Sequence, residues 1–291
     1  MKINPILKTI PETSNLYHLG INLTQQELDK FRNIKFVIMQ GSPQRTEVLA
    51  RKLARQLLQI DQRFFTPLNL STTSDYAVYR VGNVLAVSHG MGNVTIDTLL
   101  HSITKLLYFA GNTELEYIRV GTCGGLGVES GTVIITKDVF MPNLEPYYSS
   151  YELDKEIKTP TTFDDALIQR IVQSQPHDLA FPLLIANSIA ADDFYLGQCR
   201  YDGAMASTKN QAQRLEFFAQ AQELGIYSFE MESSALAAFC CRAQIPATMV
   251  AVALLNRYNG DQVKASATQL AEFAEHAQQV VINYLQSKTP Y

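Results

Sequence analysis

Two hydrophobic periodicities alternate along this chain, and their alternation constrains the fold more than any other feature. Short apolar runs, typical of buried strands, are followed by segments whose apolar residues recur every three or four positions, as in amphipathic helices. Strands that alternate with helices predict an α/β fold with a largely central sheet. We predict strands at 36–39, 84–88, 117–120, 132–136, 183–186 and 248–255, and helices at 45–57, 96–109, 232–241 and 267–285.

The domain organisation follows from what the sequence lacks. The 291 residues contain no internal repeat, no low-complexity tract and no linker rich in proline, glycine or serine. We therefore expect a single domain over residues 1–291. The segment 138–165 has the weakest pattern of the chain, and we expect it to form a long insertion or a mobile loop.

The charge balance and the apolar stretches limit the classes of partner. Lys and Arg number 24, Asp and Glu number 28, and the formal net charge is −4. A general nucleic-acid binder carries a basic face, so this balance argues against nucleic acid and leaves room only for a local basic pocket. No stretch approaches the ~20 apolar residues that cross a bilayer, and the N-terminus lacks the apolar core of a secretion signal. We therefore expect neither a membrane nor a nucleic acid as partner.

The four cysteines, at positions 123, 199, 240 and 241, are too few for a disulfide scaffold. They form no CxxC motif and no Cys/His spacing typical of zinc sites, so we expect no metal. Reduced and mostly buried thiols in a cytoplasmic protein are the simplest interpretation.

Three turns that contain glycine follow predicted strands. Ligands of open α/β sheets bind at the carboxyl ends of the strands, where glycines let backbone N–H groups approach an anion and arginines add charge. The turns contain Gly41 with Arg45, Gly90 with Gly92, and Gly121, Thr122, Gly124 and Gly125 after Arg119. Together they predict a phosphate cradle. A connecting role stays open, because none is a P-loop or a dinucleotide-binding motif. Arg119 is the hardest to explain structurally, since a charge in an apolar strand needs a partner or a ligand.

A second cluster combines the side chains that a planar heterocycle needs. Phe194, Gln198 and Arg200 supply an aromatic face, an amide and a guanidinium within seven residues. The amide donates and accepts at once, so it can bind an imide edge. An ordinary surface turn is the alternative.

Acidic and basic residues follow two further strands. Glu230, Met231 and Glu232 lie where a predicted strand meets a helix. Buried carboxylates are costly unless they bind something, and the vicinal hydroxyls of a sugar are natural partners. Acidic residues in the first turn of a helix are the structural alternative. Another strand ends at Leu254 and Leu255, and Arg257 adds a cation there.

These segments, in this order, resemble the nucleoside phosphorylase superfamily, and within it the uridine phosphorylases of animals. The resemblance covers residues 17–261, and its blocks, each modestly specific, leave little room for coincidence together. The blocks are GSPQR at 41–45, VSHGMG at 87–92, YIRVGTCGGLGVESGTVIIT at 117–136, DFYLGQCRYDGA at 193–204, EMESSALAAFC at 230–240 and LLNRYNGDQ at 254–262.

The resemblance implies the fold, the reaction and the partners. It implies a single α/β domain whose mixed, barrel-like central sheet is flanked by helices. The implied reaction is the reversible phosphorolysis of uridine to uracil and ribose 1-phosphate in pyrimidine salvage, a pentosyl transfer that needs no metal or organic cofactor. It also implies a homodimer with a shared active site, in which His18 reaches the ribose of the neighbouring subunit.

The resemblance also assigns roles to individual residues. Phosphate would be held by Gly41, Arg45, Arg119 and Thr122. The base would be bound by Phe194, Gln198 and Arg200 and flanked by Leu254, Leu255 and Arg257. The ribose would contact Glu230, Met231 and Glu232, while Cys123 and Gly124 line the nucleoside side of their loop. Of these, Arg45, Arg119, Gln198 and Arg200 would carry the catalysis.

Two positions depart from the family pattern. Asp75 stands where the family commonly has an arginine that reaches phosphate from the partner subunit. An acid near phosphate would repel it, and Arg80 is a candidate substitute for the missing cation. Cys123 stands where serine is usual, a near-isosteric change.

Three alternative functions remain open. A purine nucleoside phosphorylase usually has an aspartate where this chain has Asn256. A hydrolytic nucleosidase would not need the arginines at 45 and 119, since water requires no anion cradle. The third alternative is a catalytically weakened paralogue that binds nucleoside, with Asp75 as the lesion.

Overall fold

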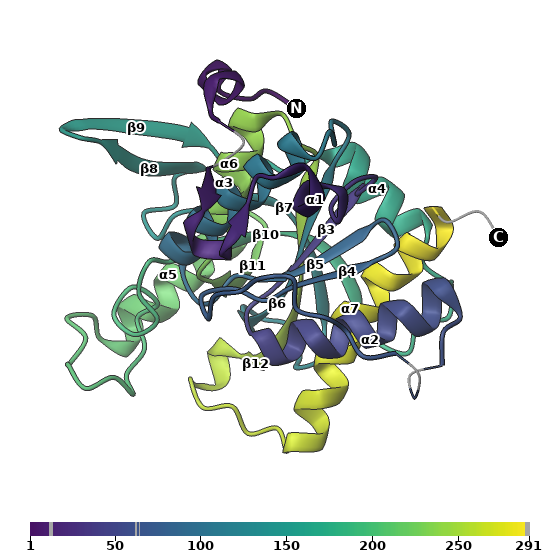
Figure 1. The fold of residues 1–291 in the computed structure, drawn as a ribbon. Coiled ribbons are helices and arrows are strands. Elements are labelled where there is room, and N and C mark those ends of the chain that lie inside the picture. The colour runs from purple at the N-terminus through teal and green to yellow at the C-terminus, as the bar shows by residue number, and fades with distance from the viewer. Residues whose placement is uncertain (12–13, 62, 64, 289–291) are drawn as a thin grey trace.

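The computed structural model describes residues 1–11, 14–61, 63 and 65–288. Its centre is an eight-stranded mixed sheet with the strand order β11-β10-β7-β12-β6-β3-β5-β4 (Figure 1). The strands are β3 (Phe36–Gln40), β4 (Val78–Val81), β5 (Val84–Ser88), β6 (Glu116–Gly125), β7 (Val133–Phe140), β10 (Leu183–Ala190), β11 (Ile226–Glu230) and β12 (Ala247–Asn256).

One end of this sheet closes on itself. β11 pairs antiparallel with the end of β6, through Ser228 with Gly125 and Phe229 with Gly124. The pairing joins β6, β12, β7, β10 and β11 into a closed barrel, while β3, β5 and β4 extend from β6 as an open sheet. The expectation of an α/β fold with a mixed, barrel-like sheet is therefore confirmed. All six predicted strands are present, and β6, β7 and β10 continue past their predicted ends.

Helices cover the sheet in two groups (Figure 1). The helices α2, α4 and α7 pack together beside β4, β5 and β12, and α3 packs on α6. The helices are α1 (Gln25–Asp29), α2 (Pro43–Leu58), α3 (Asn93–Phe109), α4 (Asp165–Gln173), α5 (Gln211–Glu223), α6 (Ser233–Ala243) and α7 (Ala267–Lys288). The four helices expected from periodicity are thus confirmed, whereas α1, α4 and α5 were not predicted.

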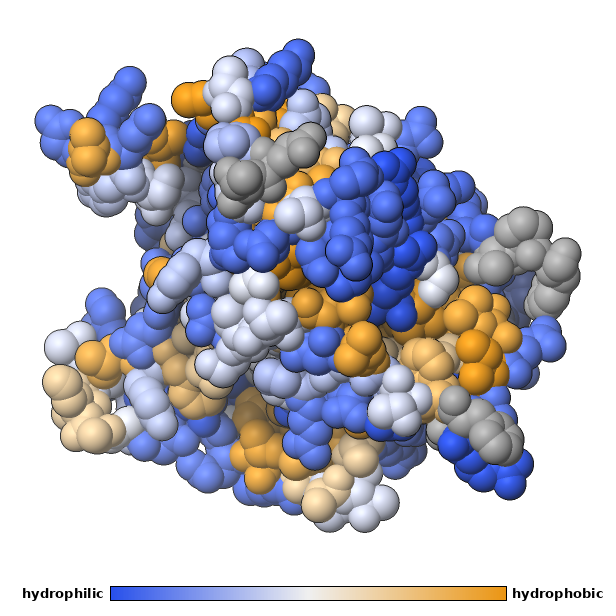
Figure 2. Space-filling view, viewed as in Figure 1, coloured by the Kyte–Doolittle hydropathy of each residue, from blue (hydrophilic) through white to orange (hydrophobic). Residues whose placement is uncertain are grey.

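The weakly patterned segment 138–165 forms an insertion with secondary structure of its own, which agrees with the first of the two expectations. It contains the antiparallel hairpin of β8 (Tyr147–Glu152) and β9 (Lys155–Pro160), which projects from the body (Figure 1). Its tip is exposed and partly apolar (Figure 2): Leu153 is 96% accessible and Tyr151 71%. A hairpin with few buried residues has little hydrophobic periodicity, which is why the sequence pattern missed it.

The N-terminal segment docks on the body. It comprises η1 (Pro5–Thr9), β1 (Asn15–Leu16), η2 (Tyr17–Leu19) and β2 (Ile21–Asn22). The Thr73 hydroxyl donates to the His18 carbonyl at 2.7 Å, and the Ser71 hydroxyl donates to the Leu19 carbonyl at 3.0 Å. These bonds fix the backbone around His18.

Two further expectations concern membranes and thiols. Among the described residues, no helix is both long and apolar enough to span a bilayer. All four cysteines are free, but only Cys123 and Cys240 are buried, whereas Cys199 is half-buried and Cys241 is exposed. The expectation of mostly buried thiols is therefore only half right.

Candidate active site

The predicted site residues gather where strands of the sheet end. β3, β5 and β6 are parallel neighbours, so their carboxyl ends meet at one edge. β12 runs parallel to β6, and β11 meets the end of β6 by closing the barrel. This topology brings together the turns after β3, β5, β11 and β12 from distant parts of the sequence.

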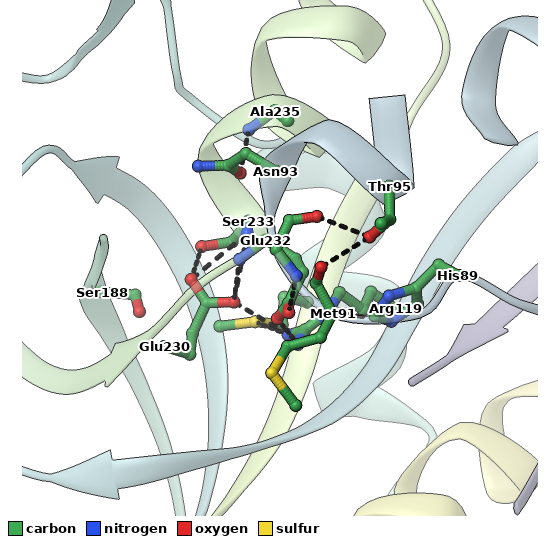
Figure 3. Close-up of polar contacts among 12 residues, drawn as sticks. His89, Met91, Asn93, Thr95, Arg119, Ser188, Glu230, Glu232, Ser233 and Ala235 are labelled. Atoms are coloured by element: carbon green, nitrogen blue, oxygen red, sulfur yellow. Dashed lines mark hydrogen bonds and ion pairs between the residues drawn. The ribbon is translucent and has the colours of Figure 1, made fainter. Parts of the chain in front are cut away.

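Arg119 lies at the centre of this edge, on β6, and is 4% exposed (Figure 3). Its guanidinium pairs with two carboxylates, Glu230 at 3.0 Å through Nη1 and Glu232 through Nη2. Its Nε donates to Nε2 of His89 at 3.3 Å. A buried charge needs a partner or a ligand, as the sequence analysis expected for Arg119. Here protein side chains are its partners.

A glycine on the same strand makes room for that guanidinium. A Cβ at Gly121 would lie 2.6 Å from Nη1 and 2.9 Å from Cζ of Arg119. The glycine-rich run was interpreted as a means for backbone to approach an anion. At Gly121 the space is instead filled by an arginine side chain, which curls back over the strand.

The turn between β11 and α6 holds the two carboxylates in different roles. Glu230 caps α6, because its carboxylate accepts from the backbone N–H groups of Glu232 at 2.9 Å and Ser233 at 3.1 Å. Glu232 makes no such cap and accepts from the Gly92 N–H at 2.7 Å and from Arg119. Burial raises the pKa of the Glu230 carboxyl, although the positive charge of Arg119 acts to lower it. The helix-cap alternative is therefore correct for Glu230 but not for Glu232.

The residues predicted to hold phosphate differ in their burial and in their partners. A Cβ at Gly41 would lie 3.9 Å from Cε1 of His89, which places Gly41 beside the partner of Arg119. Arg45 lies in the first turn of α2 and is exposed, and its guanidinium makes no hydrogen bond or ion pair with other described residues. Thr122 is half-buried on β6. The Arg45 cation and the N-terminus of α2 thus remain free to attract an anion.

The base cluster lies in a largely exposed turn that combines two buried polar side chains with the Phe194 ring, which is 39% exposed. Gln198 and Arg200 are 4% and 8% exposed, and the Cys199 backbone between them is left-handed, with φ of 51°. The guanidinium of Arg200 stacks on the Phe194 ring at 4.3 Å and pairs with Asp202 at 3.0 Å. The expected aromatic, amide and guanidinium therefore do converge.

Arg257 lies behind this cluster and is 1% exposed. It donates through Nη1 to Oε1 of Gln198 at 2.9 Å and through Nη2 to the Gln198 carbonyl at 2.6 Å. A Cβ at Gly124 would lie 2.8 Å from Cδ of Arg257, so this second glycine also makes room for an arginine. Burial lowers the pKa of Arg257 to about 10, which leaves it charged at neutral pH.

The remaining predicted residues line the same edge. Leu255 on β12 is in register with Gly124 of β6. Cys123 is buried, and burial raises the pKa of its thiol, so it stays protonated. Met231 lies close to Gly92, where a Cβ would be 4.0 Å from its Cε. Leu254 is half-buried beside Leu255.

Asp75, which departs from the family pattern, and Arg80, the candidate substitute for the missing cation, both have partners of their own. Oδ2 of Asp75 lies 3.1 Å from Nδ1 of His18, and these side chains are 46% and 44% exposed. Arg80 donates to the carbonyls of Lys30 at 2.6 Å and Gly82 at 3.0 Å. The structure thus engages Arg80 away from the site edge, which argues against it as the substitute cation.

Sequence reasoning missed three buried polar residues. Arg214 and Asp261 form an ion pair at 2.6 Å, and Asp261 also lies 3.0 Å from Nε of Arg257. His89 is fully buried, and burial holds its pKa well below the ordinary value, so the ring is neutral and can accept from Arg119. The signal for His89 was its place in the VSHGMG block, directly after a strand. In the described part of the chain, no group of three or more His, Cys, Asp or Glu residues could hold a metal ion.

Comparison with known proteins agrees with this geometry. Residues 35–286 match the family model of the phosphorylase superfamily. Uridine phosphorylase 1 of Mus musculus is 32% identical over 97% of this chain and 90% of the mouse protein. Inactive uridine phosphorylase B of Schistosoma mansoni is 30% identical over 92% of this chain and 90% of that protein. The crystal structure of Schistosoma mansoni uridine phosphorylase in complex with uracil superposes with a TM-score of 0.91, at 30% identity, over 98% of this chain and 99% of that one. The chain therefore belongs to the phosphorylase superfamily, in its uridine phosphorylase branch.

Proposed function

We propose that residues 1–291 act as one phosphorylase domain that converts uridine and inorganic phosphate reversibly to uracil and ribose 1-phosphate, a pentosyl transfer in pyrimidine salvage. The observation that carries the proposal is Arg119, a buried cation with His89 and Gly41 on one side and two carboxylates on the other. An anion and a sugar placed on these two sides would meet at one guanidinium.

The proposal assigns each group of residues to one part of the substrates. Phosphate is held by Gly41, Arg45, Arg119 and Thr122. The ribose contacts Glu230, Met231 and Glu232, and the base lies among Phe194, Gln198, Arg200, Cys123, Gly124, Leu254 and Leu255.

Charge development explains why these residue types suffice. Cleavage of the glycosidic bond builds positive charge on the ribose and negative charge on the uracil. Phosphate held by Arg45 and Arg119 stabilises the sugar cation and attacks it. Donors from Gln198 and Arg200 stabilise the leaving base, so the barrier falls through positioning and electrostatics, and no protein side chain serves as covalent nucleophile.

The carboxylates link sugar binding to phosphate binding. Glu232 accepts from the Arg119 guanidinium and from the Gly92 N–H. Vicinal ribose hydroxyls can donate to the same carboxylate. Binding of the nucleoside would therefore weaken the hold of Glu232 on Arg119 and make the guanidinium available to phosphate.

The proposal includes a homodimer with a shared active site. His18 is fixed by its docked backbone, yet its side chain is 44% exposed, and the adjacent Tyr17 is 79% exposed. Near the site, Met91 and Val94 are 70% and 78% exposed. Exposed apolar side chains around a fixed histidine suit contact with a second copy of the chain, whose ribose His18 would reach. A cytoplasmic location stays a prediction, supported by four cysteines that are all free.

A purine phosphorylase is less well supported. Where that branch uses an aspartate at the base, Asn256 turns its side-chain oxygen to the backbone N–H groups of Tyr258 at 3.1 Å and Gly127 at 3.2 Å. The side chain is thereby committed to capping η4 (Arg257–Asn259).

The test is uracil release from uridine, with and without inorganic phosphate. We expect release only with phosphate, and Arg119→Met should abolish it. Equal release without phosphate would indicate a nucleosidase, faster turnover of inosine would indicate a purine phosphorylase, and binding of uridine without turnover would indicate a non-catalytic paralogue. For the shared site, mixing His18→Ala with Arg119→Met subunits should restore part of the activity, and a fully active monomer would contradict it.

A further inference from the structure

Arg257 was expected to flank the base near its recognition loop, and its contacts run to Gln198 of that loop. Its guanidinium is 1% exposed and donates to both the side-chain and backbone oxygens of Gln198. Nε2 of Gln198, in contrast, makes no hydrogen bond with any described residue. The amide is therefore anchored by its oxygen, and its nitrogen is left available.

The anchor is rigid because the surroundings of Arg257 fix it. Its stem fills the space left by Gly124, 2.8 Å from where a Cβ would be. Asp261 lies 3.0 Å from its Nε and is itself held by both Nη atoms of Arg214, at 2.6 and 2.9 Å. Asp261 therefore stays paired even when Arg257 is replaced.

An anchored amide can bind only one kind of base edge. With one lone pair of Oε1 engaged by Arg257, the second lone pair can accept the N3–H of uracil, and Nε2 can donate to the adjacent carbonyl. Cytosine has an unprotonated N3 at this place, so two acceptors would face each other. An amide rotated by half a turn would suit cytosine, but it would bring its NH₂ group against the N–H donors of Arg257.

We propose that Arg257 is a specificity-determining positioning residue, which holds the Gln198 amide in the orientation that accepts uracil and excludes cytosine. This inference rests on the proposed function, because it assumes that the base binds at Gln198. It extends that function by naming a residue that does not itself touch the base and yet sets the choice between uracil and cytosine.

The experiment first establishes that the wild type phosphorolyses uridine, since failure there would count against the proposed function and not against this inference. Dissociation constants for uracil and cytosine are then measured by calorimetry for the wild type and Arg257→Met. Loss of a buried hydrogen bond to a charged donor typically changes affinity by about 10- to 100-fold. We expect the uracil-to-cytosine affinity ratio to fall by at least about tenfold.

Three further variants separate orientation from packing. Arg214→Met perturbs the same buried cluster but leaves both hydrogen bonds from Arg257 to Gln198 in place, so it should lower the ratio much less than Arg257→Met does. Arg257→Lys keeps a donor toward the Gln198 oxygen and should retain most of the ratio. If Arg257→Met does not fold, Arg257→Gln gives the same test, because its neutral amide can pair with either orientation of Gln198. Equal weakening of both bases in a folded Arg257 variant, or a fall of the ratio in Arg214→Met as large as that in Arg257→Met, would overturn the proposal.

Discussion

Glu232 pairs with Arg119, the residue proposed to hold phosphate, and this pair leads to a prediction with opposite effects on binding and turnover. The carboxylate accepts from the Arg119 guanidinium and from the Gly92 N–H at 2.7 Å, and the paired side chains are only 7% and 5% exposed. Phosphate must compete with this buried acid. Replacing Glu232 with glutamine removes the negative charge but keeps an acceptor for Gly92.

The size of the effect follows from the difference between the two hydrogen bonds. Arg119 stays charged in the variant, so the contact remains a hydrogen bond to a charged group at about 1.5–3 kcal/mol, and exchanging the carboxylate for a neutral amide costs a part of that range, about 1 kcal/mol. The difference of about 1 kcal/mol predicts about fivefold tighter binding of phosphate to Glu232→Gln. Turnover of uridine should fall by about 10- to 100-fold, because the ribose hydroxyls lose their charged acceptor.

Calorimetric titration with inorganic phosphate, without nucleoside, measures the first effect, and steady-state assays measure the second. Glu272→Gln, the same substitution at an exposed position of α7, serves as the matched control and should change neither. Weaker phosphate binding in Glu232→Gln would refute the idea that this carboxylate competes for Arg119.

Three other substitutions test separate parts of the site. Gln198→Leu should lower uridine turnover by about 10- to 100-fold and leave phosphate affinity nearly unchanged, since only a base contact is lost; an unchanged rate would remove Gln198 from the site. Burial holds the pKa of His89 well below 6.5, so below that pH the unfolded chain binds a proton that the folded protein does not, and stability falls as the pH falls. In His89→Gln the free energy of unfolding should therefore fall by about 1.4 kcal/mol less per pH unit than in the wild type, measured by urea unfolding at several pH values from 5 to about 7.5. An identical pH slope in the two proteins would show that His89 titrates normally. Asp75→Ala should raise the KM for uridine by only a few fold, because the exposed pair with His18 contributes less than about 1 kcal/mol; a changed KM for phosphate would instead show that Asp75 faces the anion.

Local sequence determined the elements and most of the residues of the site. The alternation of apolar runs and helical stripes fixed the α/β class, because each element buries its own apolar face whatever its neighbours are. Arg119 was recognisable as exceptional because a charge in a buried strand is costly wherever the strand lies. The turn residues after β3, β6, β11 and β12 could be identified because the residue types that suggest binding lie close together in the sequence.

Tertiary structure decided how these pieces meet. Closure of the barrel depends on β11 pairing with β6, whose partners lie about a hundred residues apart, and no local pattern encodes that register. The purpose of Gly124 was likewise hidden, because Arg257, whose side chain occupies its space, follows a different strand of the sheet. The contact of Arg257 with Gln198 has the same cause. The position of a strand end follows from sequence, whereas the direction of a buried side chain is set by the packing and charges of every element around it.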